Sequence, residues 1–538
     1  MKYFKFKPNK KYYLNLSRSF ALILLISSQL SCTAPEKSNR IIVATAGNID
    51  SVDPAQANTL STLQLISALG DPLYRLSSEG SLEPRLAKEE PEISADGLVI
   101  SIPLRENVFF HDGTPFNSEA MAFTLKRFID IGTLNYVIDD RIKSIETPEP
   151  YLIKIRLSRP SSSIKGFLTS LNITPVSPAK YGDLNNKKFL SSEFVGTGPY
   201  KLTNFKNNKQ RLEPNENYWG KPPSNKGIDY INYKNSTSLY GAIRTGEIDV
   251  LLSNSLEDGQ RLSLHQISSK GKLKEGNGPA MQIGYIALRS NSYPFNKKTI
   301  RQAISYSINR KVISKNVGFG LRTPLRSLVP PVLKANRDNP WPVYEPDKSR
   351  KLLKEAGFCN QNKLTIPLTF RSNVPSDKLL ALTWQQQINK DLSDCLVLNL
   401  NGVQSTTIYK QLSEGSYDAV ILGWTGDYPD SHAYLSPLLD CKKIILDKQI
   451  CLEGEAVYGG TFWATQEIQK ALEESELLNG LERSNKLNEV ELMAADGAAL
   501  LPIWLLNPSA WARPDLSQPE FDGNGRLILQ RLKKQLNE

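Results

Sequence analysis

The most constraining feature of this sequence is an alternation of short apolar strand patterns with amphipathic helical patterns, joined by connections of only a few residues. KLTIPLTF, CLVLNL and YDAVILG are examples from the second half, each separated from the next by a segment of helical spacing. Such alternation predicts α/β lobes. The chain has 538 residues, which is too long for one ordinary domain. We therefore expect two or three lobes, closely packed and joined by short crossings.

The first 31 residues have a different character from the rest. They contain six basic and no acidic residues, and they end in the apolar run FALILLISSQL and Ser31, just before Cys32. This order is typical of a secretory signal peptide. The run is shorter than the ~20 apolar residues that span a bilayer. We expect residues 1–31 to be removed and Cys32 to carry a lipid, as in bacterial lipoproteins; an ordinary signal peptide with an incidental Cys is the alternative.

The formal net charge of +11 at first suggests a nucleic-acid partner. The six basic residues of the first segment account for part of it, and their removal leaves +5 for the remainder. The remainder shows no basic block interleaved with aromatic residues, which is the pattern that nucleic-acid binding requires. We therefore expect no nucleic-acid partner.

Four further cysteines, Cys359, Cys395, Cys441 and Cys451, permit two disulfides in an exported chain. Four cysteines allow three pairings. We favour Cys441–Cys451, because CKKIILDKQIC closes a short loop, and this choice leaves Cys359–Cys395. Four buried free thiols are the alternative.

The sequence gives little sign of metal or catalytic chemistry. Its three histidines, His111, His265 and His432, are scattered, and no Cys-x-x-Cys occurs, so we expect no directly bound metal and no cofactor. His111 stands beside Asp112 in FHDGTPF, but Asp-Gly-Thr-Pro is the composition of a tight turn into a helix, so we expect a structural role. We expect His432 at the surface or at a helix cap. With no Gly-x-Ser-x-Gly and no His-Glu-x-x-His, we expect no catalytic residues and no enzyme.

Two other motifs also have a structural interpretation. VGTGPYKL lacks the Lys-Ser/Thr of a phosphate-binding loop and leads into a strand, so we expect a segment that crosses between lobes. Tyr218 and Trp219 in NENYWG are expected to pack in a core or at an edge rather than to contact a ligand.

Several motifs follow one another in a characteristic order: SVDPAQANTL, LEPRLAKEEPEISADGLVISIPL, VFFHDGTPF, VGTGPYKL, NENYWGKPP, AIRTGEIDV, FNKKTIRQAISYSINRKVI and PDKSRKLLKEAGF. From about residue 41 to the C-terminus this order resembles family 5 of the solute-binding proteins of bacterial ABC importers, the peptide- and nickel-binding type. One departure is Asn309, where the family usually has Asp, at a position that we expect to be structural.

The resemblance implies an α/β, periplasmic-binding-protein-like fold of type II in its large cluster C form, with two lobes, a hinge and an extra subdomain. It also implies docking on the permease and ATPase subunits of an ABC importer. We expect a monomer, located in the periplasm and anchored to the membrane by its lipid. The expected segments are signal peptide 1–31, lipid-anchored tether 32–40, first lobe 41–77, extra subdomain 78–194, first lobe again 195–275, second lobe 276–497 and return to the first lobe 498–538.

The loop GWTGDYPD follows the strand pattern YDAVIL. In α/β lobes, ligands bind beyond the carboxyl ends of strands. In peptide-binding members of the resembled family, the Asp at the place of Asp427 pairs with the ligand's α-amino group, and a buried carboxylate persists where it meets a cation. We expect ligand contacts from Gly423, Trp424, Thr425, Gly426, Asp427 and Tyr428.

Within this loop, Trp424 can offer its ring face, and the two glycines let the main chain approach an extended ligand. The alternative is that Asp427 caps the following helix and that Trp424 lies in the core. For Asp430 we expect the capping role.

These patterns predict a lipoprotein that captures short peptides between two lobes and delivers them to a membrane permease. A nickel or other metal chelate is the alternative solute, and an exported hydrolase or a lipid-anchored sensor are alternatives from other classes. No motif selects the Arg or Lys that would meet the carboxylate of a peptide.

Overall fold

The computed structural model describes residues 40–535, except 58, 78, 139, 183–188, 207, 254–255 and 336–338. The expected signal peptide, Cys32 and the tether up to residue 39 lie outside the described residues. Residues Arg40–Glu538 belong to one compact unit. In the part of the chain that is described, every helix is too short or too polar to cross a membrane.

The first lobe is built on a sheet that has seven strands in the described residues. Its order is β12 (Lys274–Asn277), β21 (Ser509–Ala512), β11 (Val250–Leu252), β1 (Ile41–Ala46), β10 (Ile228–Tyr233), β9 (Lys209–Pro214) and β8 (Tyr200–Lys206). Strand β1 pairs in parallel with both β10 and β11. The most central strand thus belongs to the sequence immediately after the tether.

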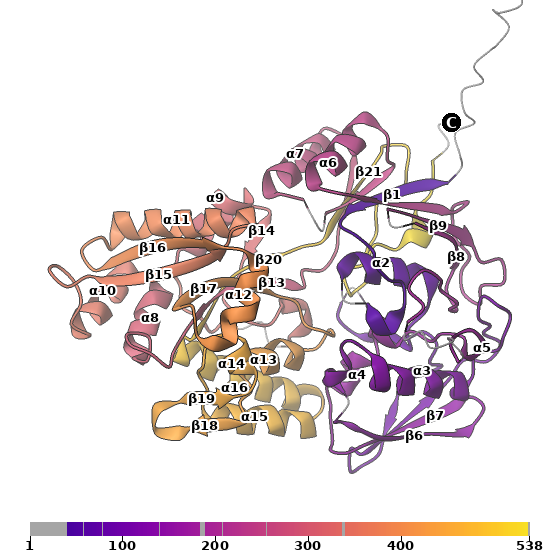
Figure 1. Cartoon of the computed structure of the whole chain (residues 1–538), viewed down its shortest axis with the longest axis horizontal. Helices are drawn as coiled ribbons and strands as arrows, with labels where there is room; N and C mark the ends of the chain where they lie inside the picture. The colour runs from indigo at the N-terminus through magenta and orange to yellow at the C-terminus, as the bar shows by residue number, and fades with distance from the viewer. Residues whose placement is uncertain are drawn as a thin grey trace, which may run out of the picture. The chain divides into compact units, whose positions relative to one another are not determined.

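Helices cover both faces of this sheet, because successive side chains of a strand point to opposite sides. Val43 of β1 joins the core cluster of α2 (Leu60–Leu69), whereas Ala44 joins that of α6 (Ser236–Thr245) and α7 (Asp258–Ser269). Figure 1 shows α2 on one side of β1 and the pair α6 and α7 on the other.

The second lobe has a six-stranded sheet among the described residues. Its order is β14 (Arg322–Pro324), β20 (Leu500–Leu506), β13 (Gln282–Leu288), β17 (Ala419–Trp424), β15 (Leu364–Arg371) and β16 (Leu396–Val403). Strand β17 pairs with β13 and β15 and is buried on both faces, which explains its continuous apolar run AVIL. The loop expected to bind ligand therefore follows an interior strand.

Helices enclose the second sheet from both sides. Figure 1 shows α9 (Arg310–Gly318) and α11 (Pro375–Asp391) over one face, and α8 (Lys298–Tyr306) and α10 (Pro346–Glu355) over the other. Asn309 accepts a hydrogen bond from the N–H of Val312 at 3.2 Å and so caps α9, in agreement with a structural role. The remaining helices of this part are α12 (Ser405–Gln411), α13 (His432–Leu439), α14 (Glu455–Tyr458), α15 (Gln466–Leu477) and α16 (Gly480–Gly497).

A separate antiparallel sheet lies in the range expected for the extra subdomain. Its order is β4 (Glu92–Ile93), β5 (Val99–Pro103), β7 (Leu152–Leu157) and β6 (Ile142–Glu149), and the helices of this range are α3 (Ser118–Ile131), α4 (Ile164–Phe167) and α5 (Pro178–Tyr181). Its core cluster also includes Tyr428 and Ala433 of the second lobe. Two hairpins complete the strands: β2 (Tyr74–Leu76) with β3 (Leu82–Pro84), and β18 (Lys443–Ile445) with β19 (Ile450–Glu453).

The motifs expected to be structural make local contacts. The ring of His111 contacts Gly198 O at 3.1 Å through Nε2 and accepts from Gly196 N–H at 3.4 Å through Nδ1, and burial lowers its pKa to about 4. Asp112 accepts a hydrogen bond from Ser177 at 2.6 Å. Gly198 lies so close to the end of α2 that an added Cβ would be 2.4 Å from the carbonyl carbon of Leu69. These groups hold the turn before α3 and the segment that leads from the subdomain into β8, so the expectation that VGTGPYKL crosses between the two lobes is wrong.

Tyr218 and Trp219 likewise have a packing role. Tyr218 Oη and Trp219 Nε1 each donate to the buried Asp71 at 2.9 Å. The guanidinium of Arg85 donates to Asp71 at 2.7 Å and stacks 5.0 Å from the centroid of the Trp219 ring. Tyr218 and Trp219 thus contact Asp71 and Arg85 of the protein itself, as the expected packing role requires.

Two segments, 278–281 and 507–508, connect the strands of the two main sheets. They lie side by side, because Gly278 N–H donates to Pro508 O at 2.8 Å and Asn507 Nδ2 donates to Gly278 O at 3.1 Å. The second crossing corrects the expected boundary at residue 498. Strand β20 still pairs with β13 and β14 in the second sheet, so the return to the first lobe begins after Leu506. The apolar run LLPIWLL does not by itself indicate which of the two sheets contains it.

Both disulfides of the favoured pairing are present in the structure. Cys359 is bonded to Cys395, 36 positions away, and Cys441 to Cys451, 10 positions away. The first joins the turn after α10 to the start of β16, and the second closes the base of the β18–β19 hairpin. Each therefore links neighbouring elements of the second lobe.

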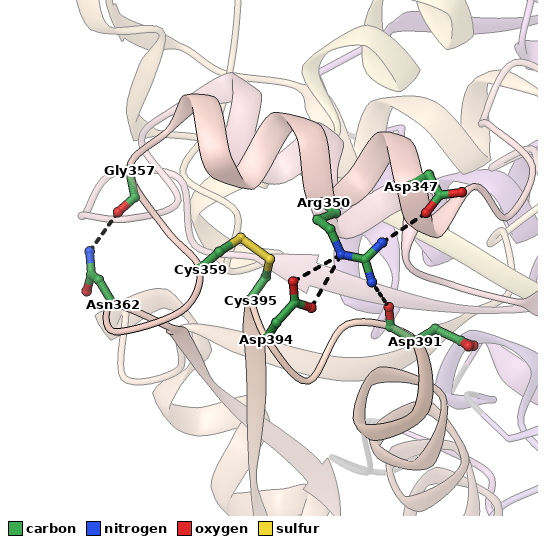
Figure 2. Close-up of a disulfide and its surroundings, with 8 residues drawn as sticks. All are labelled: Asp347, Arg350, Gly357, Cys359, Asn362, Asp391, Asp394 and Cys395. Atoms are coloured by element: carbon green, nitrogen blue, oxygen red, sulfur yellow. Dashed lines mark hydrogen bonds and ion pairs between the residues drawn. A yellow bond between two sulfur atoms is a disulfide. The ribbon is translucent and has the colours of Figure 1, made fainter.

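Figure 2 shows an arginine beside the longer-range disulfide. Arg350 of α10 donates to Asp347 at 2.9 Å, to Asp394 at 3.1 Å and to the backbone carbonyl of Asp391. The disulfide and this arginine thus fasten α10 to the connection between α11 and β16 at two neighbouring points.

Removing the two disulfides singly should destabilise the protein unequally. In the loop-entropy description, a cross-link over 36 positions contributes about 4 kcal/mol and one over 10 positions about 3 kcal/mol. We expect Cys359→Ser with Cys395→Ser to lower the free energy of unfolding more than Cys441→Ser with Cys451→Ser, as measured by urea denaturation. Equal stability of the wild type and both double variants would contradict this expectation.

Candidate ligand-binding site

A cavity of about 360 Å³ lies where the two lobes and the extra subdomain meet. Its walls come from α2, residues 169–172, α7, the crossing at 506–508, residues 524–526 and the loop 425–429. Its volume lies within the range of about 300–1,000 Å³ that is usual for small-molecule sites. The loop singled out in the sequence therefore lines an interlobe cavity.

Asp427 is the only acidic residue among the described residues that line this cavity. Its side chain is partly buried, and within the described part of the chain no hydrogen bond or ion pair to its carboxylate is found. Burial alone raises the pKa of Asp427 to about 6. At neutral pH the cavity wall therefore carries a negative charge that the protein does not compensate.

The neighbours of Asp427 divide into cavity residues and packing residues. Thr425, Gly426 and Tyr428 line the cavity, but Gly423 and Trp424 do not. Trp424 packs against the core of the second lobe, and its Nε1 donates to Ala433 O at 3.1 Å. Trp424 is thus partly buried beside the core and outside the lining of this cavity, and its contact with a ligand stays a prediction.

Two side chains fix the backbone of the loop on the second-lobe side. A Cβ added to Gly426 would lie 2.7 Å from a ring carbon of Tyr434, so only Gly fits against this ring. Tyr434 is fully buried, and its Oη donates to Met281 O at 2.5 Å, beside the first crossing between the lobes. The residue before Asp427 is therefore held close to the hinge.

The residue after Asp427 is held by the extra subdomain. Tyr428 is buried, and its ring meets that of Phe167 edge to face with centroids 6.4 Å apart. Gly166 permits this approach, since an added Cβ would be 3.0 Å from Tyr428 and 3.0 Å from Asp430. The Tyr428 side chain therefore joins the second lobe to the subdomain, in addition to its place in the cavity wall.

Asp430 precedes Ser431, the N-cap of α13; it accepts from the first N–H of the helix, close to the expected capping role, and also forms an ion pair. It accepts from the N–H of His432 at 2.8 Å and from both terminal nitrogens of Arg483, each at 2.8 Å. His432 was expected at the surface or at a helix cap; it begins α13, as the second expectation has it, but it is buried, and burial lowers its pKa. The pair fixes the start of α13 to α16.

A polar network next to Asp430 crosses to the subdomain. Glu476 accepts hydrogen bonds from Ser161 and Ser163, both at 2.6 Å, and Arg141 approaches it at 3.5 Å. Burial opposes the ionisation of Glu476, but His432, Arg483 and the two hydroxyl groups outweigh it and lower the pKa to about 2. Glu476 is therefore ionised at neutral pH and holds the two parts together.

Three guanidinium groups line the cavity: Arg261, Arg322 and Arg526. Arg322 of β14 forms a buried ion pair with Asp258 of α7 at 2.9 Å, which joins the two lobes. Sequence motifs did not identify these arginines, because they lie far apart in the chain and meet only when α7, β14 and the C-terminal segment pack together. The turn-rich DGNGR around Arg526 was the sole local signal.

The described lining offers hydrogen-bond donors, one carboxylate and apolar walls. It contains neither His nor Cys, and Asp427 has no second carboxylate beside it in this lining, so nucleophile–base and paired-carboxylate arrangements do not arise there. The group of potential metal ligands found in the described residues is Cys359, Asp394 and Cys395, whose two sulfurs form a disulfide. The arrangement is suited to holding a polar, charged small molecule.

The comparison with protein families matches residues 81–444 to bacterial extracellular solute-binding proteins, family 5. Among curated relatives, the glutathione-binding proteins GsiB of Escherichia coli O1:K1 and of Escherichia coli strain K12 are each 27% identical over 432 residues. The match covers 78% of this chain and 81% of each relative.

Solved structures of similar fold include a dipeptide-binding protein from Pseudoalteromonas sp. SM9913 in complex with Met-Leu. It has a TM-score of 0.74 and 23% identity, and the match covers 92% of this chain and 100% of that one. NikA from Brucella suis in complex with Fe(III)-EDTA has a TM-score of 0.79 and 19% identity, with the same coverage. The expected periplasmic-binding-protein-like α/β fold is confirmed.

Replacing Asp427 by Asn should stabilise the ligand-free protein. A rise in the carboxyl pKa from 3.8 to about 6 corresponds to about 3 kcal/mol of folding free energy lost on ionisation. Because the folded-state pKa is the higher one, this loss is absent below about pH 4, grows between pH 4 and 6, and is complete above pH 6. Thermal unfolding at pH 4 and pH 8 should show an advantage of Asp427→Asn only at pH 8; a lower melting temperature at pH 8 would contradict this.

Proposed function

Because the chain belongs to family 5 of the bacterial extracellular solute-binding proteins, we propose that its solute is a short peptide with a free α-amino group, bound between the lobes. As a family 5 protein, it is the solute-binding component of an ABC importer, works with permease and ATPase subunits, and is not an enzyme. The single observation that carries the proposal is the unpaired, partly buried carboxylate of Asp427 in the cavity wall.

Physical chemistry favours an ammonium group as the partner of this carboxylate. An ionised carboxylate removed from water is costly unless a cation and hydrogen bonds compensate it. An α-ammonium supplies both, through charge-assisted hydrogen bonds that are stronger than neutral ones. Asp427 would thus receive the N-terminus of the peptide, while the wall formed by Thr425 and Gly426 offers main-chain groups alongside it.

Other parts of the lining suit a peptide. Leu60, Leu63, Leu256 and Met281 provide apolar surface for side chains. Similar proteins support the choice of solute: relatives are named glutathione-binding proteins, and a similar structure holds Met-Leu.

A metal chelate is the second candidate, because the three guanidinium groups of the lining would attract an anionic complex. A similar structure contains Fe(III)-EDTA. The unpaired carboxylate of Asp427 argues against it, since a chelate without an ammonium group would leave that charge buried and uncompensated.

We also propose that the protein is an extracytoplasmic monomer attached to the membrane through a lipid on Cys32. The support is the basic, acid-free segment with its apolar run before Ser31 and Cys32. A lipid anchor would keep the binding protein close to its permease.

Asp427→Asn should weaken the binding of free-amine di- and tripeptides by at least about 2 kcal/mol, or roughly 30-fold, because one partner of a buried charge pair loses its charge. Since the free carboxyl has a pKa of about 6 and an ammonium favours its ionised form, wild-type affinity should fall below pH 6 while that of the variant should not. Isothermal titration calorimetry measures both effects.

The matched control is Asp447→Asn, which changes an exposed carboxylate in the turn of the β18–β19 hairpin and should leave affinity unchanged. N-acetylated peptides should bind the wild type about as weakly as free peptides bind Asp427→Asn. Equal affinity of acetylated and free peptides for the wild type would refute the amine assignment, and tight binding of a nickel chelate without peptide binding would favour the second candidate.

Cys32→Ser should release the protein from the membrane fraction, because the residue that would carry the lipid is lost. Cell fractionation and immunoblotting measure this. Retention of the variant in the membrane fraction would disprove the lipid anchor without bearing on the solute.

A further inference from the structure

The cavity lining contains more positively charged than negatively charged side chains. Arg261, Arg322 and Arg526 face a single carboxylate, that of Asp427, among the described lining residues. Arg322 is compensated by its ion pair with Asp258, which accepts from it at 2.9 and 3.2 Å. The two remaining guanidinium groups, Arg261 and Arg526, have no ion pair within the part of the chain that the structure describes.

Arg261 is a buried cation whose Nη2 has hydrogen-bond acceptors but whose Nε has none among the described residues. It is 4% exposed, and its Nη2 donates to Asn507 O at 2.7 Å and to Ser509 Oγ at 3.2 Å. Its Nε is buried and has no hydrogen-bond partner among the described residues. Burial lowers the pKa of Arg261 to about 10, so the group stays charged at neutral pH.

Arg526 has a similar environment at the other side of the same crossing. Its Nη1 donates to Asn524 O at 3.2 Å, and its buried Nε also lacks a partner among the described residues. The residue before it, Gly525, is close to Pro508, since an added Cβ would lie 3.1 Å from the proline ring. Both arginines therefore adjoin the segment 507–508, which connects the two lobes.

These positions divide the cavity by charge. The carboxylate of Asp427 comes from the second lobe, whereas Arg261 of α7 and Arg526 of the C-terminal segment come from the first. A buried N–H donor without a partner costs about 1–3 kcal/mol, and a carboxylate is the strongest acceptor for a guanidinium. The buried Asp522 acts on Arg526 electrostatically and partly offsets the lowering of the Arg526 pKa by burial, but its carboxylate accepts from the backbone N–H groups of Asn524 and Arg526. No ion pair between the Asp522 and Arg526 side chains is found in the part of the chain that the structure describes. A peptide with one carboxylate therefore leaves the Nε of one of the two guanidinium groups without an acceptor.

We propose that Arg261 and Arg526 together form an anion-binding end of the cavity and select acidic peptides, with one ammonium and two carboxylate groups. This inference rests on the proposed function and specifies its substrate class. The α-ammonium lies at Asp427, and the terminal and side-chain carboxylates lie at the two arginines. Such a ligand spans the two lobes with opposite charges and so stabilises their contact across the hinge.

The test uses peptide pairs that differ in one charge at nearly constant shape: Ala-Glu against Ala-Gln, and Ala-Glu-Ala against Ala-Gln-Ala. Calorimetric titration of the wild-type protein should show at least about tenfold tighter binding of the Glu member in one pair, the effect of one charge-assisted hydrogen-bonded contact. Arg526→Gln should reduce this preference to about twofold or less, and Arg526→Lys should retain part of it.

Arg244→Gln is the matched control, because Arg244 is an exposed arginine of α6 outside the cavity lining. This variant should prefer the Glu peptides over the Gln peptides as strongly as the wild type does. Arg261 is not the first choice for substitution, since its Nη2 also holds the crossing segment. Circular dichroism establishes whether each variant is folded. If Arg526→Gln does not fold, Arg526→Lys still tests the role of Arg526.

The outcomes separate this inference from the proposed function. Equal binding of the Glu and Gln members by the wild type, with amine dependence intact, overturns the acidic preference and leaves the proposed function standing. A Glu preference that persists unchanged in Arg526→Gln overturns the role of Arg526. Failure of the wild type to bind any of the four peptides overturns both.

Discussion

The candidate site depends on one buried charge: the carboxylate of Asp427, set in the wall of an interlobe cavity with no partner of its own among the described residues. Its backbone is fixed from two directions. On one side Gly426 packs against the ring of Tyr434 in the second lobe, and on the other Tyr428 enters the core of the extra subdomain. A charge in such a position favours the cationic end of a solute and, at the same time, costs folding free energy when the cavity holds none.

Contacts between lobe and lobe, or lobe and subdomain, surround this charge. Arg322 and Asp258 join α7 to β14 beside the cavity, and Glu476 receives the hydroxyl groups of Ser161 and Ser163 from the subdomain. These two contacts are charged and hydrogen-bonded, whereas Tyr428 makes an apolar contact with the subdomain. Polar contacts between domains form and break more readily than large apolar ones when lobes move. The solute and the interlobe contacts are therefore expected to depend on each other, because both bridge the same surfaces.

Local patterns predicted much of the fold. Strands such as β17 and helices such as α10 follow directly from apolar periodicity, and Asn309, expected to be structural, caps a helix. The same reasoning failed where the position of a segment depended on contacts with residues far away in the sequence. The run containing β20 is typical of a buried strand in either sheet, so the return to the first lobe was expected too early. His432 was expected at the surface or at a helix cap; it is the first residue of α13, and it is buried.

The sequence by itself determined the α/β character, the order of motifs that places the chain in its family, and the loop that carries Asp427, because each depends on residues that are neighbours in the chain. Only the tertiary structure decided that Trp424 packs inward, and which arginines share the cavity with Asp427. Arg261 and Arg526 are 265 positions apart in the sequence, and they meet because the chain crosses twice between the lobes. Long-range packing of this kind leaves no local pattern, since it depends on which surfaces remain to be buried once every element has formed.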